Sequence, residues 1–159
     1  MLRYKHKQGF TLIEVVITAS VFLVVILGVA GSFSSAVRTS IQNVDKVKAS
    51  FLGEEGLEAV RLLRDSSWTG NIADKTSGAP FYLHFDGVSW TATSTNVLID
   101  EVFERSIVFS DVYRDSSQNI VSTGGTLDPD IKKVTTLISW SYKGATTTRS
   151  LSTYLSNIF

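Results

Sequence analysis

A single carboxylate stands at the start of a long apolar segment. Glu14 closes the stretch KQGFTLIE, and residues 15–37 that follow it contain no charged side chain. An ionised carboxylate in a bilayer is costly and marks a functional site whose partner has to be identified. Residues 10–37 hold no cation. Cleavage between Gly9 and Phe10 would create one, because it frees an α-amino group four residues before Glu14.

The new amine defines the chemistry open to Glu14. It can pair with Glu14 of its own chain, or with Glu14 of a neighbouring chain whose helix is displaced by about one turn. Inside a bundle of helices such a pair would neutralise both charges. The spacing therefore indicates that Glu14 acts in assembly and fixes the register between subunits.

The apolar segment is the element that must position these groups. As a helix, residues 15–37 would span roughly 35 Å, enough to cross the hydrocarbon core of a bilayer. The residues before it, MLRYKHKQG, are basic and contain no acid, which is typical of an end that stays in the cytoplasm. We therefore expect a single-pass protein of the cytoplasmic (inner) membrane, with the N-terminus inside and the rest of the chain outside.

The helical pattern continues beyond the apolar segment. Apolar residues recur at three- and four-residue spacings as Ile41, Val44, Val47 and Phe51. A similar stripe resumes with Leu57, Val60 and either Leu63 or Arg64. Gly53 and Gly56 weaken this pattern, since each costs about 1 kcal/mol relative to alanine. The sequence predicts one long helix that ends near residues 66–71, with an amphipathic half over residues 38–66.

Residues 67–159 change to the two-residue period of strands. Residues 80–93 alternate on both sides of Asp86-Gly87, residues 103–115 form another strand, and residues 132–157 form a long hairpin that turns at Lys143-Gly144. Residues 122–130, with two glycines and a proline, are predicted as a loop. Most of the aromatic residues are expected in a core between helix and sheet: Trp68, Trp90, Trp140, Phe81, Tyr82, Phe85, Phe103 and Phe109. The fold class is α+β, with the helix packed on an antiparallel sheet.

KQG followed by FTLIEVVITASVF resembles the type III signal of type IV pilins and type II secretion pseudopilins. The resemblance implies that a membrane-embedded prepilin peptidase cuts between Gly9 and Phe10 and methylates the new N-terminus at Phe10. It implies a pilin-like fold of four segments: a basic leader (1–9), a membrane-spanning and filament-core half of the helix (10–37), the amphipathic half (38–66) and an extracytoplasmic head of β-strands (67–159). The other partners it implies are pilin or pseudopilin subunits, bound through the helix.

Two departures from major pilins favour a minor pilin or a pseudopilin. Gly28 and Gly31 stand where major pilins often carry a helix-kinking proline, and the first proline here is Pro80. We expect these glycines to make the helix locally flexible. The chain also has no cysteine, which excludes the disulfide that closes a loop in many major pilins. The alternative function is a pilin-like adhesin or DNA-uptake component whose head binds a ligand.

Other interpretations of the N-terminal segment explain less. Ser34-Ser35-Ala36 is a passable cleavage site for an ordinary secretory signal. A plain membrane anchor is the second alternative. Both interpretations leave Glu14 without a role.

Composition and motifs indicate a structural protein and not an enzyme, with no cofactor. No G-x-S-x-G, H-E-x-x-H, P-loop or G-x-G-x-x-G motif occurs in the sequence. Asp128 and Asp130 are weak calcium candidates, because two carboxylates supply too few of the six to eight oxygens that calcium needs. Loss of residues 1–9 would remove Arg3, Lys5 and Lys7 and no acid, so we expect no general binding of nucleic acid.

Overall fold

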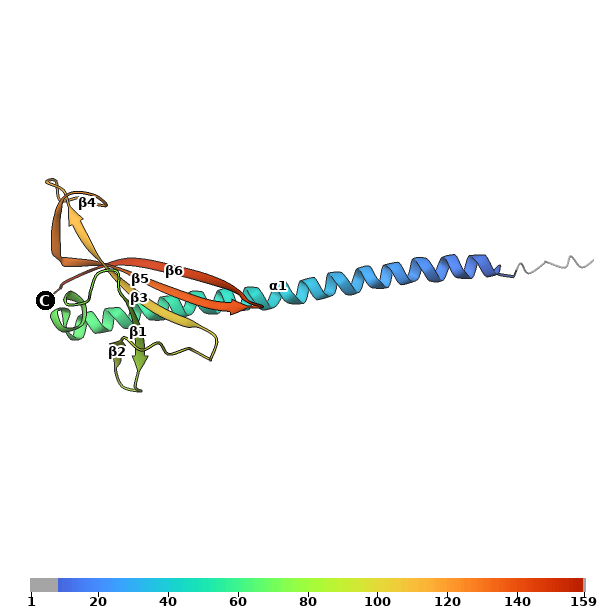
Figure 1. Cartoon of the computed structure of the whole chain (residues 1–159), viewed down its shortest axis with the longest axis horizontal. Helices are drawn as coiled ribbons and strands as arrows, with labels where there is room; N and C mark the ends of the chain where they lie inside the picture. The colour runs from blue at the N-terminus through green and yellow to red at the C-terminus, as the bar shows by residue number, and fades with distance from the viewer. Residues whose placement is uncertain (1–8, 159) are drawn as a thin grey trace, which may run out of the picture. The chain divides into compact units, whose positions relative to one another are not determined.

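The computed structural model describes residues 9–158 and confirms the α+β fold (Figure 1). The predicted leader lies outside the described residues except for Gly9. The described chain forms two compact units, residues 9–44 and 45–158. Its elements are α1 (Leu12–Ser66), a π-helical turn η1 (Thr69–Ala73), β1 (Pro80–Phe85), β2 (Trp90–Thr93), β3 (Glu104–Arg114), β4 (Ile120–Val121), β5 (Thr126–Tyr142) and β6 (Ala145–Ser156).

The strands form one antiparallel sheet in the order β2-β1-β3-β5-β6, and β4 pairs with β3 outside this path. Both predicted hairpins are present, but the first turns over residues 86–89 and not at Asp86-Gly87 alone. Phe85 lies opposite Trp90 across the first turn, and Tyr142 lies opposite Ala145 across the second. The second loop is the pair Lys143 and Gly144, whose φ angles of 50° and 83° are those that a type I′ turn requires.

The loop predicted over residues 122–130 is wrong from Thr126 onward, because β5 already begins there. The cause is a bulge. Asp111 of β3 pairs with Lys132, whereas the next residue, Val112, pairs with Asp128. Residues 129–131 therefore have no partner on β3, and Pro129 lies where its missing N–H breaks no ladder bond. Figure 1 shows β5 turning sharply in this region, beside the end of β3 that carries β4.

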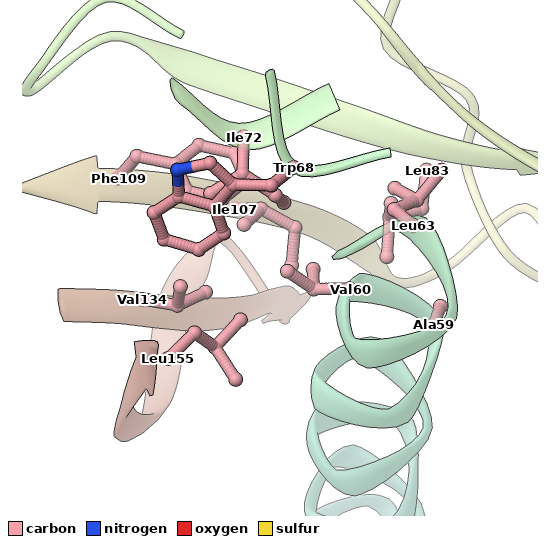
Figure 2. Close-up of a cluster of buried hydrophobic side chains, with 10 residues drawn as sticks. All are labelled: Ala59, Val60, Leu63, Trp68, Ile72, Leu83, Ile107, Phe109, Val134 and Leu155. Carbon is pink, nitrogen blue, oxygen red and sulfur yellow. The ribbon is translucent and has the colours of Figure 1, made fainter. Parts of the chain in front are cut away.

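The second half of α1 covers one face of the sheet. β3 and β5 alternate between buried and half-buried residues, as a sheet with one covered face must. Figure 2 shows Val60 and Leu63 of the helix gathered with Ile107 of β3 and Val134 of β5, and Trp68 lies in the same cluster. The aromatic prediction is confirmed for the four buried members, Trp68, Phe103, Phe109 and Trp140; Phe81, Tyr82 and Trp90 are half-buried, and Phe85 is exposed.

The helix face that meets the sheet differs from the predicted one in part. Val60 and Leu63 are buried as expected, but Ile41, Val44, Val47 and Phe51 are between 47% and 65% exposed. The buried face combines four small residues, Ala49, Gly53, Gly56 and Ala59, with Leu52, Val60 and Leu63.

Two glycines set the distance between helix and sheet. A Cβ atom on Gly56 would lie 2.9 Å from Cγ2 of Thr136, and one on Gly53 would lie 2.9 Å from Cδ1 of Leu151. Both distances are below van der Waals contact. The two glycines therefore allow a close approach that their low helix propensity alone does not reveal.

We expect Gly56→Ala to destabilise the head by about 1–2 kcal/mol, because the clash with buried Thr136 outweighs the gain in helix propensity. Gly53→Ala is the matched control. Its neighbour is the end of a flexible leucine at the sheet edge, so its net effect should be near zero. Urea unfolding of the chain in detergent, followed by tryptophan fluorescence, measures both. Equal stability of the two variants would contradict the assigned role of Gly56.

Candidate functional site

The predicted cleavage site lies ahead of the helix. Gly9, Phe10 and Thr11 are not helical, and α1 begins at Leu12. The backbone amides of Glu14 and Val15 donate to the carbonyl oxygen of Thr11 at 3.1 and 3.2 Å. The Phe10 residue is 81% exposed. The bond between Gly9 and Phe10 is therefore presented in an accessible, non-helical segment.

Glu14 lies in the first turn of α1 and is exposed. Its carboxylate forms no ion pair within residues 9–158. The N-terminal end of a helix favours negative charge, which partly explains why an acid is tolerated there. Thr18 donates its hydroxyl to the carbonyl oxygen of Glu14 at 2.7 Å, so this polar side chain is satisfied within the helix. The carboxylate remains available to a partner from outside the described chain.

The apolar side chains of the N-terminal unit are uncovered. The large apolar side chains between Phe10 and Val37 are at least 43% exposed. By length and composition, α1 is the one helix among the described residues that could cross a membrane. A groove of about 450 Å³ runs along it, lined by Phe10, Val15, Thr18, Ala19 and Phe22. These apolar side chains can be removed from water only by contact with lipid or with other apolar helices.

Gly28 and Gly31 lie within an uninterrupted part of α1. A Cβ atom on either would meet no atom within 4 Å. Packing within the chain therefore does not require glycine at these positions, in contrast to Gly53 and Gly56. Local flexibility of the helix at Gly28 and Gly31 stays a prediction.

Arg105 is a buried cation that the sequence analysis did not single out. It is 5% exposed on the helix-facing side of β3. Its Nη1 lies 3.3 Å from a carboxylate oxygen of Glu55 and 3.4 Å from the carbonyl oxygen of Leu52, which accepts its N–H. The guanidinium also lies 5.2 Å from the ring of Trp90. Arg105 therefore connects α1, β3 and β2. The sequence contained a signal for this residue. Arg105 lies between Phe103 and Ile107, where the two-residue period of the strand places a side chain on the buried face.

The acidic residues near the bulge each have a partner. Asp111 accepts a hydrogen bond from Lys132 at 2.5 Å, and Asp128 accepts one from Nε of Arg114 at 2.6 Å. The Arg114 hydrogen bond holds the pKa of Asp128 below its ordinary value. The backbone amide of Asn119 similarly lowers the pKa of Asp115.

The calcium candidates lie within this group. The other oxygen of Asp128 accepts the backbone N–H of Asp130, and the side chain of Asp130 accepts from Asn157 at 3.2 Å. Among the residues that the structure describes, no three His, Cys, Asp or Glu side chains are grouped to hold a metal ion. A cation at Asp128 would have to compete with Arg114.

The prokaryotic N-terminal methylation motif matches residues 4–30 of the chain. This motif is the signature of type IV pilin and pseudopilin prepilin-like proteins, and the resemblance found in the sequence is thereby confirmed. No curated protein and no solved structure matches the chain significantly. The motif supports a prepilin-type, pilin-like protein, and the motif and the apolar helix fit anchoring in the inner membrane.

The lowered pKa of Asp128 predicts a contribution to stability that acid removes. The folded pKa lies below the unfolded value of 3.8, so the contribution is complete above that value and is lost as the pH falls through the folded pKa. Asp128→Asn removes the charge at every pH. The difference in unfolding free energy between wild type and variant should stay constant from about pH 7 to about pH 5 and shrink below about pH 4. A difference that does not shrink in acid would show that the charge of Asp128 is not its source.

We also expect calcium to leave the stability of the head unchanged, because Arg114 already neutralises Asp128. The melting temperature of the chain in detergent should agree in excess calcium chloride and in excess EDTA. Arg114→Gln serves as the comparison, since it frees Asp128 to bind a cation. A calcium-dependent rise in the wild-type chain would contradict this expectation.

Proposed function

We propose that this chain is a structural subunit, a minor pilin or a pseudopilin, of a type IV pilus or a type II secretion pseudopilus. The observation that carries the proposal is the N-terminal unit. It combines an exposed apolar helix, an accessible Gly9–Phe10 bond and a Glu14 carboxylate that forms no ion pair within residues 9–158. Each feature alone suits a membrane anchor. Together with the methylation motif they suit a subunit that leaves the membrane for a filament.

The chain enters the membrane with residues 1–9 in the cytoplasm and the head outside. Prepilin peptidase then cuts between Gly9 and Phe10 and methylates the amine of Phe10. The methylated amine keeps its positive charge, so it still pairs with a carboxylate. Residues 10–37 leave lipid for the apolar core of the filament, and the exchange costs little because both surroundings are apolar.

Glu14 fixes the position of each new subunit. An uncompensated carboxylate in an apolar core is costly, and the amine of Phe10 on a neighbouring helix removes that cost only in the correct register. The helix contacts themselves are non-directional and would tolerate a shift along the axis. The pair therefore supplies the specificity that the apolar surface lacks.

The proposed processing has a direct test in the mass of the N-terminal peptide from native, membrane-extracted protein. We expect an N-methylated peptide that begins at Phe10. A chain that begins at Val37 would instead identify an ordinary secretory signal. An intact Met1, in cells with active prepilin peptidase, would identify a plain anchor, and either result would refute the proposal.

The role of Glu14 is tested by Glu14→Ala, with Thr18→Val as the control one turn further along the helix. Glu14→Ala should leave cleavage after Gly9 unchanged. It should lower the amount of chain in sheared filaments by more than about a hundredfold, because breaking one buried pair costs about 3–5 kcal/mol. Thr18→Val should assemble normally, because the Thr18 hydroxyl bonds only to its own helix. Normal assembly of Glu14→Ala would exclude the charge pair.

A further inference from the structure

β6 leaves a long edge of the sheet open. The strand has 12 residues, Ala145–Ser156, and it ends the strand order of the sheet. Its length corresponds to roughly 40 Å of extended chain. Within residues 9–158, no segment pairs with its outer side.

The register of the hairpin shows which backbone groups face outward. In a two-residue hairpin the residues that flank the loop, here Tyr142 and Ala145, share both ladder bonds. The register from Ala145 to Ser156 has no shift. Every second residue of β6 therefore directs its N–H and C=O away from β5, namely Thr146, Thr148, Ser150, Ser152, Tyr154 and Ser156.

The other edges of the same sheet are protected by their shortness. β2 has four residues and β4 has two. β6 lacks the proline and the bulge that often protect an edge strand, and a single charged residue, Arg149, is its one protective feature of this kind. Its outward residues are mostly serine and threonine, which pair well across strands and do not obstruct a neighbour.

The charge of the hairpin defines the occupant. Residues 132–156 contain four basic residues and no acid. Asp111 neutralises Lys132, whereas Lys133, Lys143 and Arg149 form no ion pair within residues 9–158. Pairing β6 with β6 of a second copy would bring like charges together. A strand with acidic side chains would complement them.

We propose that β6 is a docking edge for an extended, acidic segment of a different protein, which adds a strand to the sheet. Backbone hydrogen bonds to the outward residues supply the affinity, and an acid near Arg149 supplies the selectivity. This inference goes beyond the proposed filament role, because it depends on the head alone and not on Glu14 or the leader.

The test replaces Tyr154, an outward aromatic residue, with the photoreactive p-benzoylphenylalanine in the full chain in its native membranes. We expect a cross-linked adduct with a different protein, joined through a segment that contains Asp or Glu. In this background Thr148→Pro or Ser152→Pro removes an outward N–H and should lower the adduct yield roughly tenfold, because the docked strand loses hydrogen bonds and meets the proline ring. Thr148→Val and Ser152→Val keep the N–H and should stay within about twofold.

The contribution of charge is tested separately at Arg149. Arg149→Glu should lower the yield of the cross-linked adduct, whereas Arg149→Lys, which keeps the positive charge, should leave it unchanged. An adduct of two copies of this chain, an absent adduct, or equal yields in the proline and valine variants would each overturn the proposal. Should the proline variants not fold, amide exchange of the unaltered sequence decides. Thr148, Ser150 and Ser152 should exchange more slowly in membranes than in the purified chain, and equal rates would refute the proposal.

Discussion

The apolar side chains of α1 must leave water, and its two halves meet this requirement differently. From Ala49 to Leu63 the helix covers the inward face of the sheet, so one chain suffices. From Phe10 to Val37 the side chains stay exposed, and their burial requires lipid or other helices. Head and membrane segment are therefore stabilised by different surroundings. The first half can change its apolar environment without unfolding the second.

Close packing between α1 and the sheet depends on the smallest side chains. Gly56 lets the helix backbone approach Thr136, and the same position brings Arg105 within reach of Glu55 and the Leu52 carbonyl. A larger residue at position 56 would push the helix away from the sheet and leave the guanidinium with fewer partners in a dry interface, which is costly. The small size of Gly56 and the contacts of Arg105 thus favour the same short distance between helix and sheet. The helix is held in one position on the sheet by contacts that are individually modest.

Patterns of period and turn chemistry predicted most of the fold. Asp86-Gly87 and Lys143-Gly144 identified both hairpins, because those residues tolerate the backbone angles that tight turns need. The errors arose where tertiary contacts decide. Pro129 was assigned to a loop because a bulge cannot be recognised without knowing the opposite strand. Phe51 was assigned to the buried stripe because large apolar residues are expected inside, whereas the face that meets the sheet places Leu52, Val60 and Leu63 among glycines and alanines. Of the candidate site, Glu14 follows from the sequence because its charge contradicts its apolar surroundings. The position of Arg105 in its strand indicates that it is buried, but its partners Glu55 and Trp90 are known only from the tertiary structure.

Three features of the described chain are incomplete in one copy, and each requires a different chemistry. The exposed helix requires apolar contact of any kind. In the proposed filament the Glu14 carboxylate requires a cation, and the proposed docking edge of β6 accepts another backbone. The first requirement is easily met and selects little. The second selects a position along the helix axis, and the third selects a partner by sequence and charge. We infer that strength of association and identity of the neighbour are controlled by separate parts of this chain, so that the head can change its partner while the N-terminal segment keeps its register.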